Sequence, residues 1–126
     1  MYFEPVWLDQ GKTIIRFEYR DPVSVQDIVD SMNKATAMLG SVEHNVQFIV
    51  DLRGMISMPR DLVSSYPAIS RVSIFKQENF GRVVMVLDNS LLESVVSIFS
   101  RVYVKIEFVK TMDEAYLMLG VDNPIH

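Results

Sequence analysis

Residues 46–52 read VQFIVDL, a nearly continuous apolar run. A strand with this pattern is typically buried on both faces, as in a parallel sheet that helices cover on either side. Residues 82–88, RVVMVLD, repeat the pattern. Residues 104–110, VKIEFVK, alternate instead between polar and apolar side chains, which indicates a strand nearer the edge. These three runs predict strands of an α/β sheet, with the third nearer its edge.

The first twenty residues predict a β-hairpin. Residues 2–8 (YFEPVWL) and 13–20 (TIIRFEYR) are rich in β-forming residues and flank the turn sequence DQGK at residues 9–12. In the second run apolar and charged residues alternate, which indicates a half-buried strand. Pro5 has no backbone N–H to donate, so the first run should lie at the edge of the sheet.

Helical patterns separate the strands. Residues 25–39 carry apolar residues at helical spacing, with a capping pair at Ser24 and Asp27 and a terminating glycine at Gly40. Residues 59–75 predict a second helix that Pro59 opens and Pro67 kinks or divides. A third is expected over residues 90–103, with Ser90 and Glu93 as a capping box and an apolar face formed by Leu92, Val95, Val96, Phe99 and Val102.

Residues 111–120 close the chain with a fourth helix, in which Thr111 and Glu114 form a capping box and Gly120 ends the helix. The predicted order is therefore β-β-α-β-α-β-α-β-α. This order predicts an α/β fold with a mostly parallel sheet, an antiparallel first strand and helices packed on the sheet. We expect residues 1–126 to form a single domain.

Composition narrows the functional classes. The chain has 126 residues, 49% of them hydrophobic, and a formal net charge of −4. An acidic balance without a basic run argues against nucleic-acid binding and against adhesion to anionic membranes. The absence of cysteine excludes disulfides and thiolate chemistry, and no apolar run approaches the roughly 18 residues of a membrane span. The first ten residues lack the cationic start of a signal peptide, so we expect a cytoplasmic protein without an integral membrane segment.

The order of elements, on a chain this short, resembles the STAS domain family typified by the anti-sigma-factor antagonist SpoIIAA. The stretches that carry the resemblance, besides the opening strand pair, are FIVDLRGM (48–55), GRVVMVLDN (81–89) and VKIEFVKTMDEAYLML (104–119). The chain is still more similar to a sub-group of small bacterial proteins described as SpoIIAA-like or STAS/SEC14-like. The resemblance implies a SpoIIAA-like fold and a regulatory module that binds another protein, such as a kinase or anti-sigma-like regulator. The Sec14-like branch implies an alternative, a carrier or sensor of a small apolar ligand or lipid.

In the classical antagonists of this family a serine or threonine at the start of the second helix is phosphorylated. The corresponding slot here falls on residues 59–62, PRDL, which contain no hydroxyl group. The resemblance therefore implies the interaction surface without the usual serine phospho-switch. Ser57 is the only hydroxyl in the loop, and whether Ser57 or Asp51 is ever phosphorylated stays open.

No catalytic set is visible in the sequence. Asp51 stands alone, and we expect it to cap the following loop or to pair with Arg53 or Arg60. Asp51, Ser90 and Lys110 resemble the phospho-acceptor, hydroxyl and lysine of a response-regulator receiver, but the number of strand–helix units is one too few. The two histidines have no neighbours at metal or triad spacing, and no phosphate-binding glycine motif occurs. We expect a non-enzymatic protein without cofactor or metal.

The loop after residue 52 is the candidate binding site. Met55 and Met58 flank Ile56, which is more apolar than a simple bend requires. Either the loop folds back onto the core, or it forms an adaptable patch for a protein or an apolar ligand, which Tyr66, Phe75 and Phe80 would extend. In the second case, a pocket for an apolar ligand would lie near Pro67, and a homodimer is also compatible with the pattern. The candidate residues are Asp51, Gly54, Met55, Ile56, Ser57, Met58, Pro59, Arg60, Asp61 and Tyr66.

Overall fold

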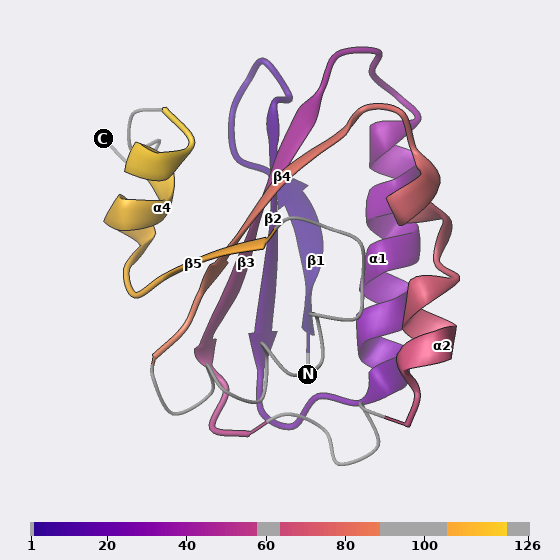
Figure 1. The fold of residues 1–126 in the computed structure, drawn as a ribbon, viewed down its shortest axis with the longest axis vertical. Helices are drawn as coiled ribbons and strands as arrows, with labels where there is room; N and C mark the ends of the chain where they lie inside the picture. The colour runs from indigo at the N-terminus through magenta and orange to yellow at the C-terminus, as the bar shows by residue number, and fades with distance from the viewer. Residues whose placement is uncertain (1, 58–63, 89–105, 121–126) are drawn as a thin grey trace.

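The computed structural model describes residues 2–57, 64–88 and 106–120, which form a five-stranded sheet in the order β1-β2-β3-β4-β5 (Figure 1). β1 runs antiparallel to β2, and β2, β3, β4 and β5 are mutually parallel. The predicted mixed sheet with an antiparallel first strand is therefore confirmed. The strands are β1 (Tyr2–Trp7), β2 (Ile14–Arg20), β3 (Val46–Gly54), β4 (Phe80–Val86) and β5 (Ile106–Val109).

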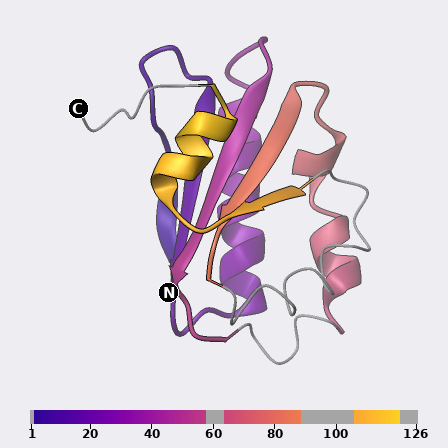
Figure 2. The ribbon, with the colours of Figure 1, turned by 60° about the vertical axis from the view of Figure 1, so that its left-hand side comes forward.

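Helices lie on both faces of the sheet. Figures 1 and 2 show α1 (Val25–Leu39) and α2 (Tyr66–Ser70) on one side and α4 (Met112–Met118) on the other. A 3₁₀ helix, η1 (Ser73–Lys76), follows α2 and contacts α1. The helix predicted over residues 90–103, with its capping box, lies outside the described residues. Within the described ranges, no helix is both long enough and apolar enough to cross a membrane.

The opening hairpin is held by Asp9. Its carboxylate accepts hydrogen bonds from the backbone N–H of Thr13 at 2.9 Å, from that of Ile14 at 3.1 Å and from the Thr13 hydroxyl. Burial raises the pKa of Asp9, but these hydrogen bonds lower it by more, so the net shift is downward. β1 is an edge strand, as Pro5 predicts, and its pairing with β2 slips between Phe3 and Val6 around that proline.

The predicted capping box forms completely at the start of α1 and in part at the start of α4. In α1, the Ser24 hydroxyl accepts from the Asp27 N–H at 3.0 Å, and the Asp27 carboxylate accepts from the Ser24 N–H at 3.1 Å. In α4, only half of the predicted box forms. The Thr111 hydroxyl accepts from the Glu114 N–H at 3.1 Å, but the Glu114 carboxylate contacts that hydroxyl instead of the backbone. Gly120 then adopts a φ of +71°, which favours glycine and ends the helix.

Two boundaries differ from the prediction. Helix α2 begins at Tyr66 with Pro67 in its first turn, where a missing N–H costs nothing, and spans five residues. The helix expected over residues 59–75 is therefore divided: residues 64–65 form a turn before α2, and residues 59–63 lie outside the described residues. The strand expected over residues 46–52 continues to Gly54, because Arg20 of β2 pairs with that glycine.

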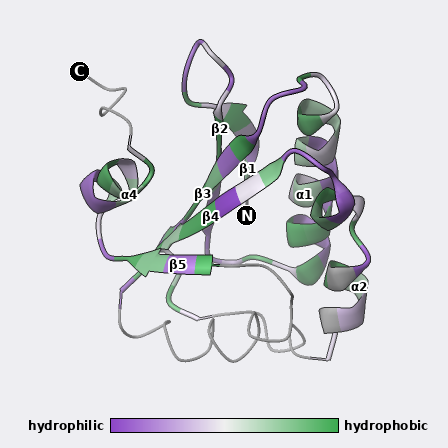
Figure 3. Cartoon of the chain, turned by 45° about the horizontal axis from the view of Figure 1, so that its top comes forward, coloured by the Kyte–Doolittle hydropathy of each residue, from purple (hydrophilic) through white to green (hydrophobic). Residues whose placement is uncertain are grey.

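Each face of the sheet carries its own hydrophobic core. Facing α1, the rings of Phe17, Phe48 and Phe80 stack in a row with centroids 6.0 and 4.8 Å apart. On the opposite face, Ile49 and neighbouring aliphatic residues pack against Tyr116 of α4. Figure 3 shows hydrophobic residues along the central strands and alternating character along α1. The prediction that residues 46–52 form a strand covered on both sides is confirmed.

Candidate interaction surface

The loop after β3 is anchored at one residue and exposed at the next. The Met55 N–H donates to the Leu52 carbonyl at 3.1 Å, which turns the chain back towards the sheet. The Met55 side chain is 4% exposed and belongs to the core on the α1 face, whereas Ile56 is 83% exposed. Ser57 is also exposed. The expectation that the loop folds back onto the core therefore holds for Met55, whereas Ile56 faces solvent.

The loop is also tied to the connection between β2 and α1. The Asp21 carboxylate accepts a hydrogen bond from the Ile56 N–H at 2.5 Å, and the Asp21 N–H donates to the Gly54 carbonyl at 3.3 Å. The exposed isoleucine therefore stands on a backbone that three separate contacts fix in place. A fixed backbone loses little conformational entropy when a partner covers it.

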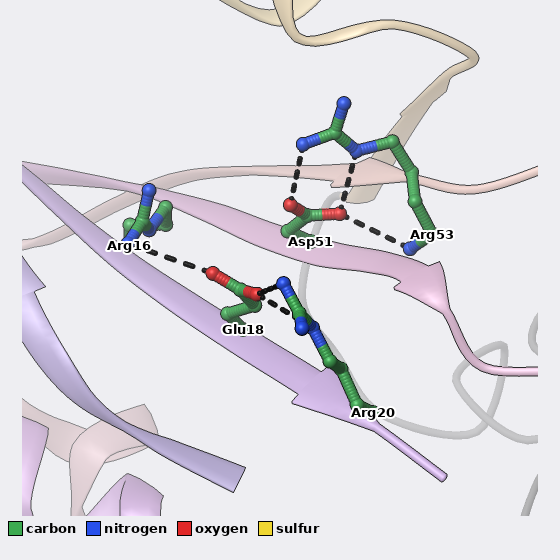
Figure 4. A network of polar contacts seen from close by, with 5 residues as sticks. All are labelled: Arg16, Glu18, Arg20, Asp51 and Arg53. Carbon is green, nitrogen blue, oxygen red and sulfur yellow. Dashed lines mark hydrogen bonds and ion pairs between the residues drawn. The ribbon is translucent and has the colours of Figure 1, made fainter.

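Asp51 forms a bidentate ion pair with Arg53, the next residue but one on the same face of β3 (Figure 4). Arg53 donates from Nε to Oδ1 at 2.9 Å and from Nη2 to Oδ2 at 2.8 Å, and its backbone N–H donates to Oδ1 at 3.1 Å. Burial raises the pKa of the Asp51 carboxyl, but these bonds and the guanidinium charge lower it by more, for a net downward shift. The prediction that Asp51 pairs with Arg53 is confirmed, and Arg60 lies outside the described residues.

Three further charged residues continue this pair onto β2. Figure 4 shows Arg16, Glu18 and Arg20 on the same sheet face as Asp51 and Arg53. Glu18 contacts Arg20 at 3.0 Å and Arg16 at 3.6 Å. The alternation of apolar and charged residues predicted only that this strand is half-buried, and it did not place its charged residues beside Asp51 and Arg53. The signal that brings them together is the period of two in both strands combined with the parallel pairing of Glu18 with Asp51.

Gly54 links the loop to this charged face. A β-carbon on Gly54 would lie 2.6 Å from Cγ of Arg20, closer than carbon atoms approach without displacement. The guanidinium of Arg20 in turn lies over the ring of Phe3, 5.0 Å from its centroid. The last residue of β3 is therefore small because an arginine of the neighbouring strand passes over it.

An apolar hollow of about 80 Å³ lies between the sheet, α1 and η1. Its described lining includes Phe48 of β3, Met32 of α1, Phe75 of η1 and Met55 of the loop. Pro67 is not among the described residues that line this hollow, so the pocket expected beside Pro67 stays a prediction. Pockets for drug-sized ligands measure roughly 300–1,000 Å³, so this hollow is several times too small for a lipid.

The remaining candidates contribute less. Tyr66 is the first residue of α2, and Met58, Pro59, Arg60 and Asp61 lie outside the described residues. His44 is exposed, and its Nε2 lies 2.8 Å from the Lys12 carbonyl oxygen. In the ranges that the structure describes, no three histidine, aspartate or glutamate side chains gather as metal ligands would.

Comparisons with protein-family models, with curated proteins and with solved structures gave no match for this chain. Functional interpretation therefore depends on the fold and on the geometry described above.

Proposed function

We propose that this protein is a non-enzymatic interaction module of the STAS type, and that the loop at residues 54–57 contacts a partner protein. The observation that carries the proposal is the exposure of Ile56, 83%, on a loop that Met55 and Asp21 hold in place. A large aliphatic side chain on a fixed backbone buries apolar area in a partner at little cost in conformational entropy. The partner that the family resemblance favours is a kinase or an anti-sigma-like regulator.

The topology supports the STAS assignment. The described residues open with an antiparallel strand pair and continue with parallel strands, and their last element is a helix that Thr111 caps. Each of these features lies in a stretch whose sequence resembles the family. The α/β sheet alone is common to many folds, so the assignment also depends on the order of strands and on the loop after β3.

The surroundings of Asp51 support a binding role over catalysis. Both carboxylate oxygens already accept hydrogen bonds from Arg53, and the lowered pKa makes this carboxylate a weak base. A nucleophile or general base needs an oxygen free to reach a substrate. Turnover of any substrate that Asp51→Ala abolishes in a folded protein would contradict the non-enzymatic proposal.

The proposal can be tested by photo-crosslinking from a single position. A photoreactive amino acid replaces Ile56 in the full chain, and a matched variant carries it at Leu117 on α4, which is 81% exposed. We expect position 56, and not position 117, to crosslink a discrete protein in cells, and excess unmodified protein to compete with the product. Equal products from both positions would show non-specific contact, and no product from position 56 would contradict the proposal.

The hollow beneath α1 favours a second candidate, the carrier or sensor of a small apolar ligand. Its lining is apolar, and Met32, Met55 and Met85 are flexible side chains that adapt to a guest. Its volume of about 80 Å³ argues against a lipid unless the lining moves apart. Native mass spectrometry of gently purified protein decides between the two candidates. A stoichiometric adduct that leaves on denaturation supports the carrier, and a phosphate that persists on the denatured chain would instead support a phospho-switch.

A further inference from the structure

The sheet face opposite α1 combines positive charge with exposed apolar side chains. We define the arginine face as Phe3, Val6, Arg16, Arg20 and Arg53. The side chains of Arg20 and Arg53 are 60% and 53% exposed, and Phe3 and Val6 are each 39% exposed. This face adjoins the loop at residues 54–57 through Gly54, which pairs with Arg20. None of its five residues belongs to that loop, and the proposed function does not require them.

The arginine face has more hydrogen-bond donors than its own carboxylates can use. Three guanidinium groups stand beside the two carboxylates of Glu18 and Asp51, which leaves a surplus of one positive charge on a chain whose net charge is −4. Arg53 and Arg20 each direct Nε and Nη2 at a carboxylate. Among the described residues, no acceptor contacts Nη1 of either side chain. Each guanidinium carries five N–H donors, so both retain free donors for a further anion.

The apolar residues indicate that the anion belongs to a peptide. Val6 lies opposite Arg16 in the pairing of β1 with β2, and Phe3 lies beneath Arg20. Neighbouring strands are about 4.8 Å apart, so the span from β1 to β3 is about 10 Å, which three extended residues cover. A segment that crosses the strands therefore places an apolar side chain on Phe3 and Val6 and acidic side chains on the arginines. A free inorganic anion would use the arginines alone.

A second copy of the chain fits this face poorly. A two-fold symmetric contact would place the arginine faces of two copies against each other. Their surplus positive charges would then repel. We infer that the arginine face binds an acidic segment of a partner protein in which an apolar residue lies beside the acids. The contact is a second interaction surface, on the side of the sheet opposite α1.

The inference can be tested by NMR on the full chain labelled with ¹⁵N, by following the Nε–H resonances of the arginines. The probe is an acetylated and amidated tetrapeptide of one leucine followed by three glutamates. We expect the Arg20 and Arg53 resonances to shift saturably, while that of Arg71, an exposed arginine at the end of α2, stays in place. Higher salt should weaken the binding because the ion pairs between the glutamates of the tetrapeptide and the arginines are exposed to solvent.

Two variants and two further probes make the test specific. Arg20→Gln with Arg53→Gln should weaken binding of the tetrapeptide about three- to tenfold, and Arg71→Gln, which removes the same kind of charge elsewhere, should not. Phe3→Ser should weaken binding of the tetrapeptide with leucine. It should leave unchanged the binding of a tetrapeptide that has glycine in place of the leucine. Equal loss from Arg71→Gln, or no saturable shift, would overturn the inference. The inference would also be overturned if inorganic phosphate shifted the Arg20 and Arg53 resonances as strongly as the tetrapeptide does. Shifts that depend on protein concentration alone, without the tetrapeptide, would overturn it too.

Discussion

Met55 and Ile56 are adjacent in sequence and opposite in environment, with side chains 4% and 83% exposed. The first holds the loop to the core beneath α1, and the second faces solvent. This contrast is the basis of the proposed binding surface, and it separates the stability of the loop from its function.

Replacement of Met55 by alanine should destabilise the fold, whereas replacement of Ile56 should not. Met55→Ala removes a buried side chain and enlarges the adjoining hollow, for which we expect a cost of about 2–5 kcal/mol in the free energy of unfolding. Ile56→Ala acts on an exposed site, so its effect should stay within about 0.5 kcal/mol. Urea denaturation measures both. Similar costs for the two variants would contradict the anchored-loop geometry.

Gly54→Ala should destabilise the protein through Arg20. Gly54 does not have a positive φ, so its backbone accepts alanine, and the cost comes from the contact of the new β-carbon with Cγ of Arg20 at 2.6 Å. We expect about 1–3 kcal/mol in the wild-type background and less when Arg20 is also alanine. A double-mutant cycle by urea denaturation measures this coupling. Strict additivity of the two substitutions would show that the close approach is not the cause.

Gly81→Ala should cost more than Gly54→Ala and should not be relieved by trimming a side chain. The added β-carbon would lie 2.5 Å from the Val46 carbonyl oxygen, a backbone atom of β3 that cannot move without disturbing the sheet. Gly11→Ala is the matched control, because its β-carbon would meet its nearest atom at an ordinary 3.5 Å. Thermal denaturation should show a clearly lower midpoint for Gly81→Ala and a midpoint close to wild type for Gly11→Ala.

The Asp51–Arg53 pair should make the fold sensitive to acid. The pKa of Asp51 is lower in the folded protein than in the unfolded chain, so its contribution to stability is present above the unfolded value, about pH 4. That contribution is lost as the pH falls through the lower, folded value. Asp51→Asn should remove about 1–2 kcal/mol at neutral pH and reduce the loss below about pH 4. Denaturation at pH 7 and at pH 3 checks this.

The denaturation of Asp51→Asn needs a second acidic group and a charge control to be considered. Asp9 also has a lowered pKa, so some acid sensitivity should remain in Asp51→Asn. Glu43→Gln, at an exposed site, controls for the change in net charge and should behave as wild type at both pH values. If Asp51→Asn matched wild type at neutral pH, the ion pair with Arg53 would be without energetic consequence.

Features that depend on local chemistry were predictable from the sequence. Alternation and apolar runs gave the strand types, and Ser24 with Asp27 gave the start of α1, because these signals act within a few residues. The pairing of Asp51 with Arg53 was also within reach, since residues two apart on a strand share a face.

Features that depend on contacts distant in sequence were not predictable. The extension of β3 to Gly54 follows from its pairing with Arg20, and the burial of Met55 follows from packing against α1 and η1. The gathering of Arg16 and Arg53 on one face requires the register between β2 and β3. Each of these needs a relation between segments that sequence patterns leave open.

The most direct test of the interaction module is the affinity of the protein that crosslinks from position 56, measured by titration calorimetry with Ile56→Asp and Leu117→Asp. Both variants place a charge on an exposed aliphatic site, so both should keep the wild-type thermal midpoint. We predict that Ile56→Asp weakens the affinity at least about tenfold, as loss of a central apolar contact does, while Leu117→Asp leaves it unchanged. Equal affinities for the two variants would contradict the assignment of the loop as the partner face.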